Sequence, residues 1–252
     1  MSTERKRARG PFRADQLRSG DPYELSDGHA IHVAPAAGRH ADATTRGAHA
    51  LSTDPDVTSA GVDVGYSPEP GTLRAPDIAI GNVPTEPGWV QGAPPLAVEY
   101  ADTGQDEDEL QRKIEDLLRA GTKYLWVVRL AGARRVEIYE QGRPMRLALP
   151  GQQLLAPGVL RNPVLVEALY DPEASMDAAL CNLLQRRGYD DLDAVRAESK
   201  AEALLEILAA RGIDVPAEVQ HRIRSCADAA QVSRWLARAV KIERIEELDE
   251  QR

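Results

Sequence analysis

Short apolar runs fill the first two thirds of the chain, whereas apolar residues recur at helical spacing in the last third. A turn dipeptide, Asp27-Gly28, separates residues 21–25 from residues 30–33 and predicts a hairpin. The run at 96–101 is almost wholly apolar, which is typical of a strand buried on both faces, and its alternation predicts that Glu99 points away from the face of Leu96 and Val98. The other alternating or apolar runs predict strands at residues 62–66, 77–80, 124–130 and 135–140, with one more within 145–170.

The best-marked helix is expected from about Asp106 to Ala120. Acidic residues at 106–109 suit a helix N-terminus, where the macrodipole favours negative charge, and Gly121 suits the C-terminal cap. Leu110, Ile114, Leu117 and Leu118 share one face and define its buried stripe. Lys113 lies on the border of that stripe. A second, weak helix is expected within residues 39–51.

The pattern becomes helical after residue 172, with helices expected at 176–187, 192–211, 216–226 and 229–248. We therefore expect a domain at 20–172 and a helical C-terminal region at 173–252. Residues 1–19 are polar and basic, and they predict a flexible arm.

Composition limits the functional classes. With 42% hydrophobic residues the chain can form a core, but no run approaches the length of a membrane span and no apolar signal core follows Met1, so a cytoplasmic protein without a membrane partner is expected. The net charge of -9 argues against a surface built for non-specific nucleic-acid binding without excluding local contacts. Cys181 and Cys226 predict buried free thiols, and the five histidines show no metal-site spacing.

Three residues carry suitable chemistry for phosphodiester hydrolysis: Asp77 follows Pro76, Glu99 lies in an apolar run, and Lys113 lies on the expected helix. This reaction needs a divalent cation that activates water and a positive group that offsets developing charge. Because Mg²⁺ is held by one or two carboxylates, Asp77 and Glu99 on neighbouring strands would suffice, with Mn²⁺ as an alternative ion. Lys113 would orient the water or offset the charge.

Each of these residues also has a simpler interpretation. Asp77 alone is typical of a strand start, and Lys113 alone is typical of an i,i+4 ion pair with Glu109 on a solvated helix edge. Glu99 is harder to dismiss, because an ionised carboxylate in an apolar run is costly unless it is paired or metal-bound. A salt bridge would satisfy that requirement as well as a metal would.

The order of these motifs resembles the Uma-two family of restriction endonucleases, in the PD-(D/E)XK nuclease superfamily. The resemblance covers about residues 21–170 and is carried by Tyr23-Glu24-Leu25 with Asp27-Gly28, Pro76-Asp77, Pro95 to Glu99, Lys113, and Gly121 leading to Trp126-Val127-Val128. It implies an α/β fold with a restriction-endonuclease-like mixed sheet core and flanking helices, to which an all-helical C-terminal appendage is added. It also implies a divalent metal, DNA cleavage and a Glu24 side chain that faces the site.

Three positions depart from the family pattern. Ala101 stands where a literal motif has lysine, so the resemblance transfers the lysine role to Lys113; Leu117 and Arg129 replace a tyrosine and an aspartate. The leading hypothesis is a Mg²⁺-dependent endonuclease acting on nucleic acid, with DNA as the expected substrate. Asp77 and Glu99 would bind the metal, and Lys113 and Glu24 would complete the site. The alternative is a non-catalytic binding or regulatory module that assembles through its helical tail. A homodimer formed through this tail is compatible with either function.

Overall fold

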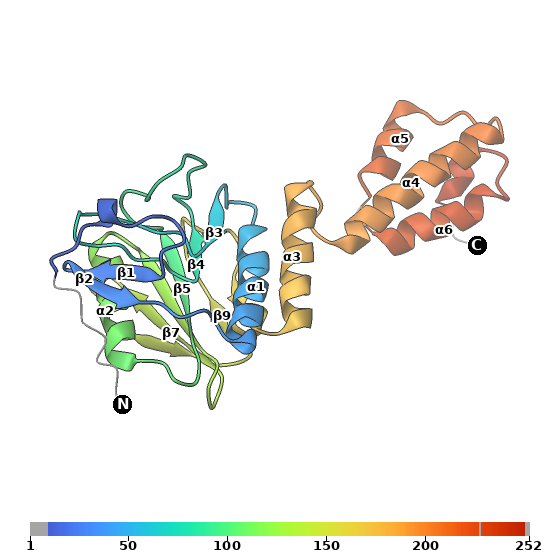
Figure 1. Cartoon of the computed structure of the whole chain (residues 1–252). Helices are drawn as coiled ribbons and strands as arrows, with labels where there is room; N and C mark the ends of the chain where they lie inside the picture. Colours follow the sequence, from blue (N-terminus) through green and yellow to red (C-terminus); the bar gives the residue numbers. More distant parts are fainter. Residues whose placement is uncertain (1–9, 227, 250–252) are drawn as a thin grey trace. The chain divides into compact units, whose positions relative to one another are not determined.

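The computed structural model describes residues 10–226 and 228–249. The chain divides into two compact units, one ending at Leu183 and the other beginning at Leu184, and Figure 1 shows the elements of each. The division falls inside helix α3, Pro172–Arg186, rather than after residue 172. Most of α3 therefore belongs with the first unit.

A six-stranded mixed sheet forms the centre of the first unit. Its order is β3-β4-β5-β6-β7-β8; only β5 and β6 are parallel, and every other neighbouring pair is antiparallel. The strands are β3 Ala60–Val62, β4 Ile78–Ile80, β5 Leu96–Ala101, β6 Tyr124–Arg129, β7 Arg135–Glu140 and β8 Arg146–Ala148. This sheet confirms the expected mixed α/β architecture.

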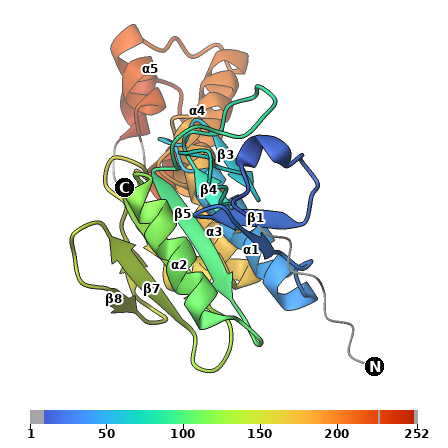
Figure 2. The same cartoon turned by 60° about the vertical axis from the view of Figure 1, so that its left-hand side comes forward.

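Two helices cover opposite faces of the sheet, α1 Gly38–Ser52 and α2 Glu107–Arg119 (Figure 2). The pleat of β5 distributes its side chains between them: Leu96, Val98 and Tyr100 pack in the core that includes α1, whereas Ala97 and Ala101 pack under α2. Glu99 shares the face of Ala97 and Ala101, as the alternation in the sequence predicts. The α2 stripe of Leu110, Ile114 and Leu117 is buried against this face.

The N-terminal hairpin consists of β1 Tyr23–Ser26 and β2 His29–His32. Residues 14–16 form a 3-10 helix, Ala14 is buried, and the Trp89 indole donates a hydrogen bond to the Ala14 carbonyl at 2.9 Å. The prediction of a flexible arm is thus wrong for residues 10–19, because Ala14 packs in a small core with Leu25 and Leu73. Residues 1–9 lie outside the described residues.

The rest of the first unit closes the core on the α1 side. Residues 145–170 contain three short strands rather than one: β8, β9 Gln153–Leu154 and β10 Val164–Leu165, followed by a 3-10 helix at Val166–Leu169. Helix α3 is tied to α1, since the Ser175 hydroxyl donates to the Arg46 carbonyl and the Asn182 amide to the Ala50 carbonyl.

The second unit is helical, as expected, with α4 Leu192–Ala210, α5 Ala217–Arg224, α6 Ala229–Ala239 and a 3-10 helix at Ile245–Leu248. Its core includes Leu204, Leu208, Ile223, Val232 and Trp235. Helix α6 ends at Ala239 rather than continuing to Leu248. The Arg211 guanidinium accounts for this end, because it donates to the carbonyls of Ala239 and Ile242 at 2.5 and 2.6 Å.

Two other predictions were wrong. The strand expected at 62–66 ends at Val62, because Asp63 has φ 51° and turns the chain, and Tyr66 forms only isolated bridges. Neither cysteine is buried: Cys181 is exposed and Cys226 is partly exposed, since α3 buries Ser175, Ala179 and Asn182 instead. Among the described residues, no helix combines the length and apolar character needed to cross a membrane.

Candidate active site

Acidic residues lie on or directly beside three neighbouring strands. Asp77 immediately precedes β4, and because Ile78 pairs with Val98, the antiparallel register continued by one residue places Asp77 opposite Glu99. Asp63 immediately follows β3, close enough to Asp77 for the two charges to interact. The sheet therefore brings the two predicted metal ligands, Asp77 and Glu99, to neighbouring positions. Asp63 is an additional carboxylate that sequence analysis missed, and partial desolvation and the nearby Asp77 charge raise its pKa.

Lys113 lies at the centre of a charged cluster rather than on a solvated helix edge. Its amine donates to the Ala75 carbonyl at 2.7 Å and forms ion pairs with Glu24 Oε1 at 3.1 Å and Glu99 Oε1 at 3.0 Å. Only 14% of the side chain is exposed. The simpler interpretation, an i,i+4 pair with Glu109, is wrong, because the Glu109 carboxylate contacts Arg74 and Arg112.

Glu99 is a buried carboxyl group with unused hydrogen-bonding capacity. The residue is 5% exposed, and Oε1 has no partner with hydrogen-bond geometry within the described chain, despite the 3.0 Å approach of the Lys113 amine. Burial raises the pKa of Glu99 to about 8, because desolvation and the neighbouring Asp77 and Glu24 outweigh the attraction of Lys113. A bound cation would therefore stabilise the ionised form of Glu99.

Asp77 is oriented by donors from two elements. Its Oδ2 accepts a hydrogen bond from the Tyr100 backbone N–H at 2.6 Å, and its Oδ1 lies 3.1 Å from Nε2 of His40 on α1. The hydrogen bond to Asp77 raises the pKa of His40. His40 was not predicted to lie in the site, and no spacing in the sequence marks it, because it reaches Asp77 only through the packing of α1 on the sheet.

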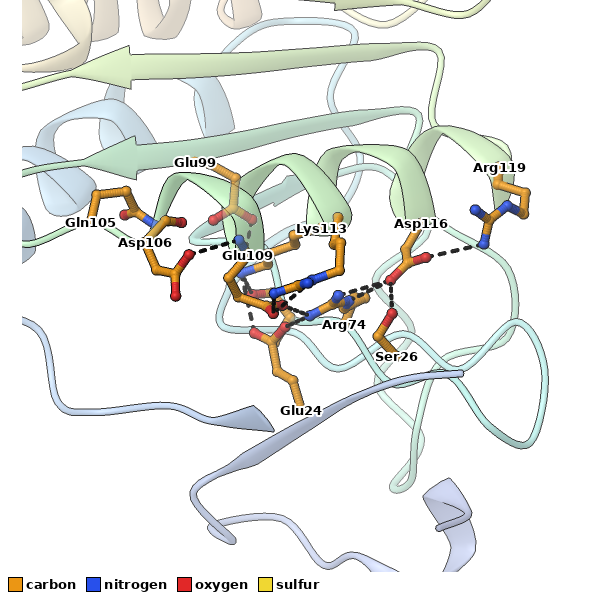
Figure 3. A network of polar contacts seen from close by, with 12 residues as sticks. Glu24, Ser26, Arg74, Glu99, Gln105, Asp106, Glu109, Lys113, Asp116 and Arg119 are labelled. Carbon is orange, nitrogen blue, oxygen red and sulfur yellow. Dashed lines mark hydrogen bonds and ion pairs between the residues drawn. The ribbon is translucent and has the colours of Figure 1, made fainter. Parts of the chain in front are cut away.

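Arg74 is almost completely buried in the cluster, with 1% exposure, which is unusual for an arginine. Its guanidinium donates to Asp116 Oδ2 and Glu109 Oε1, both at 2.8 Å, and to Glu24 Oε2 at 3.2 Å (Figure 3). Sequence analysis missed Arg74. The available signal was the polar stripe that Glu109, Lys113 and Asp116 form at i, i+4 and i+7 beside the apolar stripe of α2.

We use "site cluster" for Glu24, Arg74, Asp77, Glu99, Glu109, Lys113 and Asp116. Of the four residues predicted for the site, Glu24, Glu99 and Lys113 are joined by ion pairs, and Asp77 is close enough to raise the pKa of Glu99. The cluster contains two cations and five carboxyl groups, and at its edge Arg112 and Arg119 pair with Glu109 and Asp116.

A divalent cation fits this set of oxygens. Hard Mg²⁺ needs one or two carboxylates and keeps several of its waters. Glu99 Oε1 lies 3.0 Å from the Lys113 amine without forming a well-directed hydrogen bond, and among the described residues the Asp77 oxygens contact the Tyr100 N–H and His40. Within residues 10–226 and 228–249, no group of three or more His, Cys, Asp and Glu side chains is arranged to hold a metal ion. The arrangement is therefore compatible with a partly hydrated ion and not with a cage made wholly of protein ligands.

Comparison with known proteins agrees with this geometry. A family model named Uma2 and described as "Putative restriction endonuclease" matches residues 12–165, which run from the N-terminal segment to β10. Among solved structures, the crystal structure of "a putative nuclease belonging to DUF820" from Anabaena variabilis ATCC 29413 is similar, with a TM-score of 0.54 and 17% sequence identity. That match covers 64% of this chain and 98% of the other and shows a shared fold. No curated protein matches the chain.

Proposed function

We propose that this chain, which belongs to the Uma2 family, is a Mg²⁺-dependent endonuclease that hydrolyses phosphodiester bonds of nucleic acid, with DNA as the expected substrate. The observation that carries the proposal is the position of the Lys113 amine. It lies 3.0 Å from Glu99, which is itself opposite Asp77 in the sheet. The proposed site therefore combines the Asp77 and Glu99 carboxylates with the Lys113 amine.

Asp77 and Glu99 would hold the metal, for which Mn²⁺ is an alternative. A bound ion would polarise a phosphoryl oxygen and lower the pKa of an attacking water. The Tyr100 N–H and His40 hold the Asp77 carboxylate in one orientation. Burial destabilises the ionised form of Glu99, so a neighbouring cation would stabilise it. Asp77 is 15% exposed, so the site has a route to solvent on that side.

Lys113 acts as a fixed positive charge. Although burial alone would lower the pKa of Lys113, the Glu24 and Glu99 carboxylates raise it, so the amine remains protonated at neutral pH. A protonated amine cannot serve as a general base. Its role is to donate a hydrogen bond and to offset negative charge that develops on the phosphoryl group in the transition state.

A plasmid-nicking assay tests this function. We expect cleavage by the wild type with Mg²⁺ and none with EDTA, and a loss of about 100-fold or more in the variants Asp77→Ala and Lys113→Ala. Glu137→Gln is a matched control, because Glu137 is a buried glutamate on the same sheet that contacts no member of the site cluster. Equal activity in the wild type and both site variants contradicts the assignment.

One observation favours a second function, that of a non-catalytic binding or regulatory module. The Lys113 ion pairs with Glu24 and Glu99 already compensate part of the buried charge without a metal. Calorimetric titration with Mg²⁺ or Mn²⁺ separates the two functions, since a wild type that binds neither ion supports the binding module. Assembly as a homodimer through the helical region is a further expectation, and light scattering of the full chain and of a chain truncated before Leu184 tests it.

A further inference from the structure

Shortly before Asp77, every residue from 73 to 75 has a backbone group held by a hydrogen bond. Leu73 exchanges two backbone hydrogen bonds with Leu25 of β1, at 2.8 and 3.0 Å. Arg74 exchanges two with Tyr66, at 2.8 and 2.9 Å, and the Ala75 carbonyl accepts from Lys113. The Arg74 side chain therefore starts from a backbone position that has little freedom to move.

The Arg74 guanidinium connects two elements that deliver site residues. On one side it contacts Glu109 and Asp116, which lie four residues before and three residues after Lys113 on α2. On the other side it contacts Glu24 of β1. The Ser26 hydroxyl reinforces the connection by donating to Asp116 Oδ2 at 2.7 Å. Figure 3 shows β1 and α2 approaching Arg74 from opposite sides.

Glu24 links Arg74 to Lys113, because its two carboxylate oxygens have different partners. Oε2 accepts from Arg74 at 3.2 Å, whereas Oε1 pairs with the Lys113 amine at 3.1 Å. Among the described residues, Arg74 forms no hydrogen bond or ion pair with Glu99 or Asp77; its influence on them runs through the Glu24 carboxylate. Lysine is a poor replacement, because a compact ammonium lacks the planar fork that reaches three separate carboxylates.

We propose that Arg74 is a positioning residue, which holds Glu24 against Lys113 and thereby fixes the Lys113 amine beside Glu99. This proposal rests on the proposed nuclease function for its kinetic consequence. Its structural consequence, a restrained Lys113 amine, does not depend on activity.

The variant Arg74→Lys tests the proposal, with Arg129→Lys as the matched control. Arg129 also joins the sheet to α2, through Glu137 and Glu107, but it contacts no member of the site cluster. In the metal-free full-length proteins, the acetylation rate of Lys113 is measured by mass spectrometry relative to that of Lys123, which is exposed. The chain has five lysines, so the two labelled sites are easily resolved.

We expect Arg74→Lys to raise the relative labelling of Lys113 at least 3-fold and Arg129→Lys to leave it unchanged. In the nicking assay, kcat of Arg74→Lys should fall about 10-fold or more, with KM within 2-fold, because a misplaced charge affects the transition state more than substrate binding. If Arg74→Lys fails to fold, Glu24→Gln breaks the same connection from the hairpin side, and the same labelling change is expected.

A merely structural role gives a different result. Arg74→Lys would then lower the melting temperature while the labelling of Lys113 and kcat per folded molecule stay at wild-type values, and that outcome overturns the proposal. If the wild type does not cleave nucleic acid, the proposed function fails, whereas the labelling measurement still decides whether Arg74 positions Lys113.

Discussion

Arg74 connects α2 to the β1 hairpin and Arg129 connects α2 to the six-stranded sheet, and the surroundings of these two arginines differ in a way that separates structure from function. In what we call the Arg129 cluster, formed by Arg129, Glu107, Glu137 and Tyr139, the guanidinium donates to both Glu137 oxygens at 2.9 Å and to Glu107 at 2.6 Å. Both oxygens of its buried glutamate are thus bonded. In the site cluster, Glu99 keeps an oxygen that no hydrogen bond satisfies.

The two glutamates occupy the same row of the sheet. Glu99 of β5 pairs with Val127 of β6, and Val127 pairs with Glu137 of β7. Both are about equally buried, at 5% and 6% exposure. Burial of a charge therefore does not identify a functional site by itself. What distinguishes Glu99 is the neighbouring Asp77 and Glu24 carboxylates and the absence, among the described residues, of a bidentate donor such as the one that Arg129 gives Glu137.

The largest difference is expected in activity, when one cation is removed from each cluster. Lys113→Met should lower kcat by about 100- to 1,000-fold, because the fixed charge near the phosphoryl group is lost. Arg129→Met should leave kcat per folded molecule within 2-fold of the wild type. Steady-state nicking kinetics, normalised to the folded fraction seen by circular dichroism, check both values. Equal losses in the two variants would remove the functional distinction between the clusters.

The second difference concerns stability. Arg129→Met leaves the buried Glu137 without its bidentate partner, and the free energy of unfolding should fall by about 3 kcal/mol. Urea denaturation measures this value. The double variant Arg129→Met with Glu137→Met should recover part of the loss, because both charges are then absent. A single variant as stable as the wild type would show that the Arg129 cluster does not hold α2 on the sheet.

The third difference is a pH dependence carried by Glu99. Its pKa is about 8 in the folded chain and 4.5 ordinarily, so the folded state binds the proton more tightly between these values. The stability of the metal-free wild type relative to Glu99→Gln should therefore fall as pH rises from about 4.5 to about 8, by about 1 kcal/mol or more. Urea titrations at pH 5 and pH 8 measure the change, and a pH-independent difference contradicts the raised pKa.

The smallest expected effect concerns His40 and Asp77. The hydrogen bond that His40 donates to Asp77 raises the pKa of His40 above 6.5, so the pair stabilises the fold fully below pH 6.5 and loses this contribution as pH rises through the folded-state value. NMR titration of the imidazole, assigned with His40→Gln, should show a lower pKa in Asp77→Asn. An identical pKa in that variant would show that Asp77 does not hold His40.

The sequence predicted those elements whose signals are local. The strand at 96–101 and the helix at 107–119 have an apolar run, an acidic N-terminus and a glycine after the end, and these features act within a few residues of each other. The same is true of the alternation that placed Glu99 on the face opposite Val98. Glu24, Asp77 and Lys113 were identified by the order of motifs and by family resemblance.

The sequence could not predict the partners that decide what those residues do. Glu109 lies four residues before Lys113, and local spacing favours an ion pair between them. The Glu109 carboxylate instead pairs with Arg74, which lies outside the helix. Arg74 and Glu24 are fifty positions apart, and His40 meets Asp77 only after α1 packs on the sheet. Such contacts depend on tertiary packing, which no periodic pattern along the chain records.

Metal binding by two matched variants tests the central claim most directly. Calorimetric titration of Mn²⁺ into the wild type, Glu99→Gln and Glu137→Gln compares two buried glutamates in one row of one sheet. The account predicts the same Kd for the wild type and Glu137→Gln, and a Kd at least about tenfold weaker for Glu99→Gln, a loss of about 1.4 kcal/mol or more. Equal binding by Glu99→Gln and the wild type, or no binding by any of the three proteins, would contradict it.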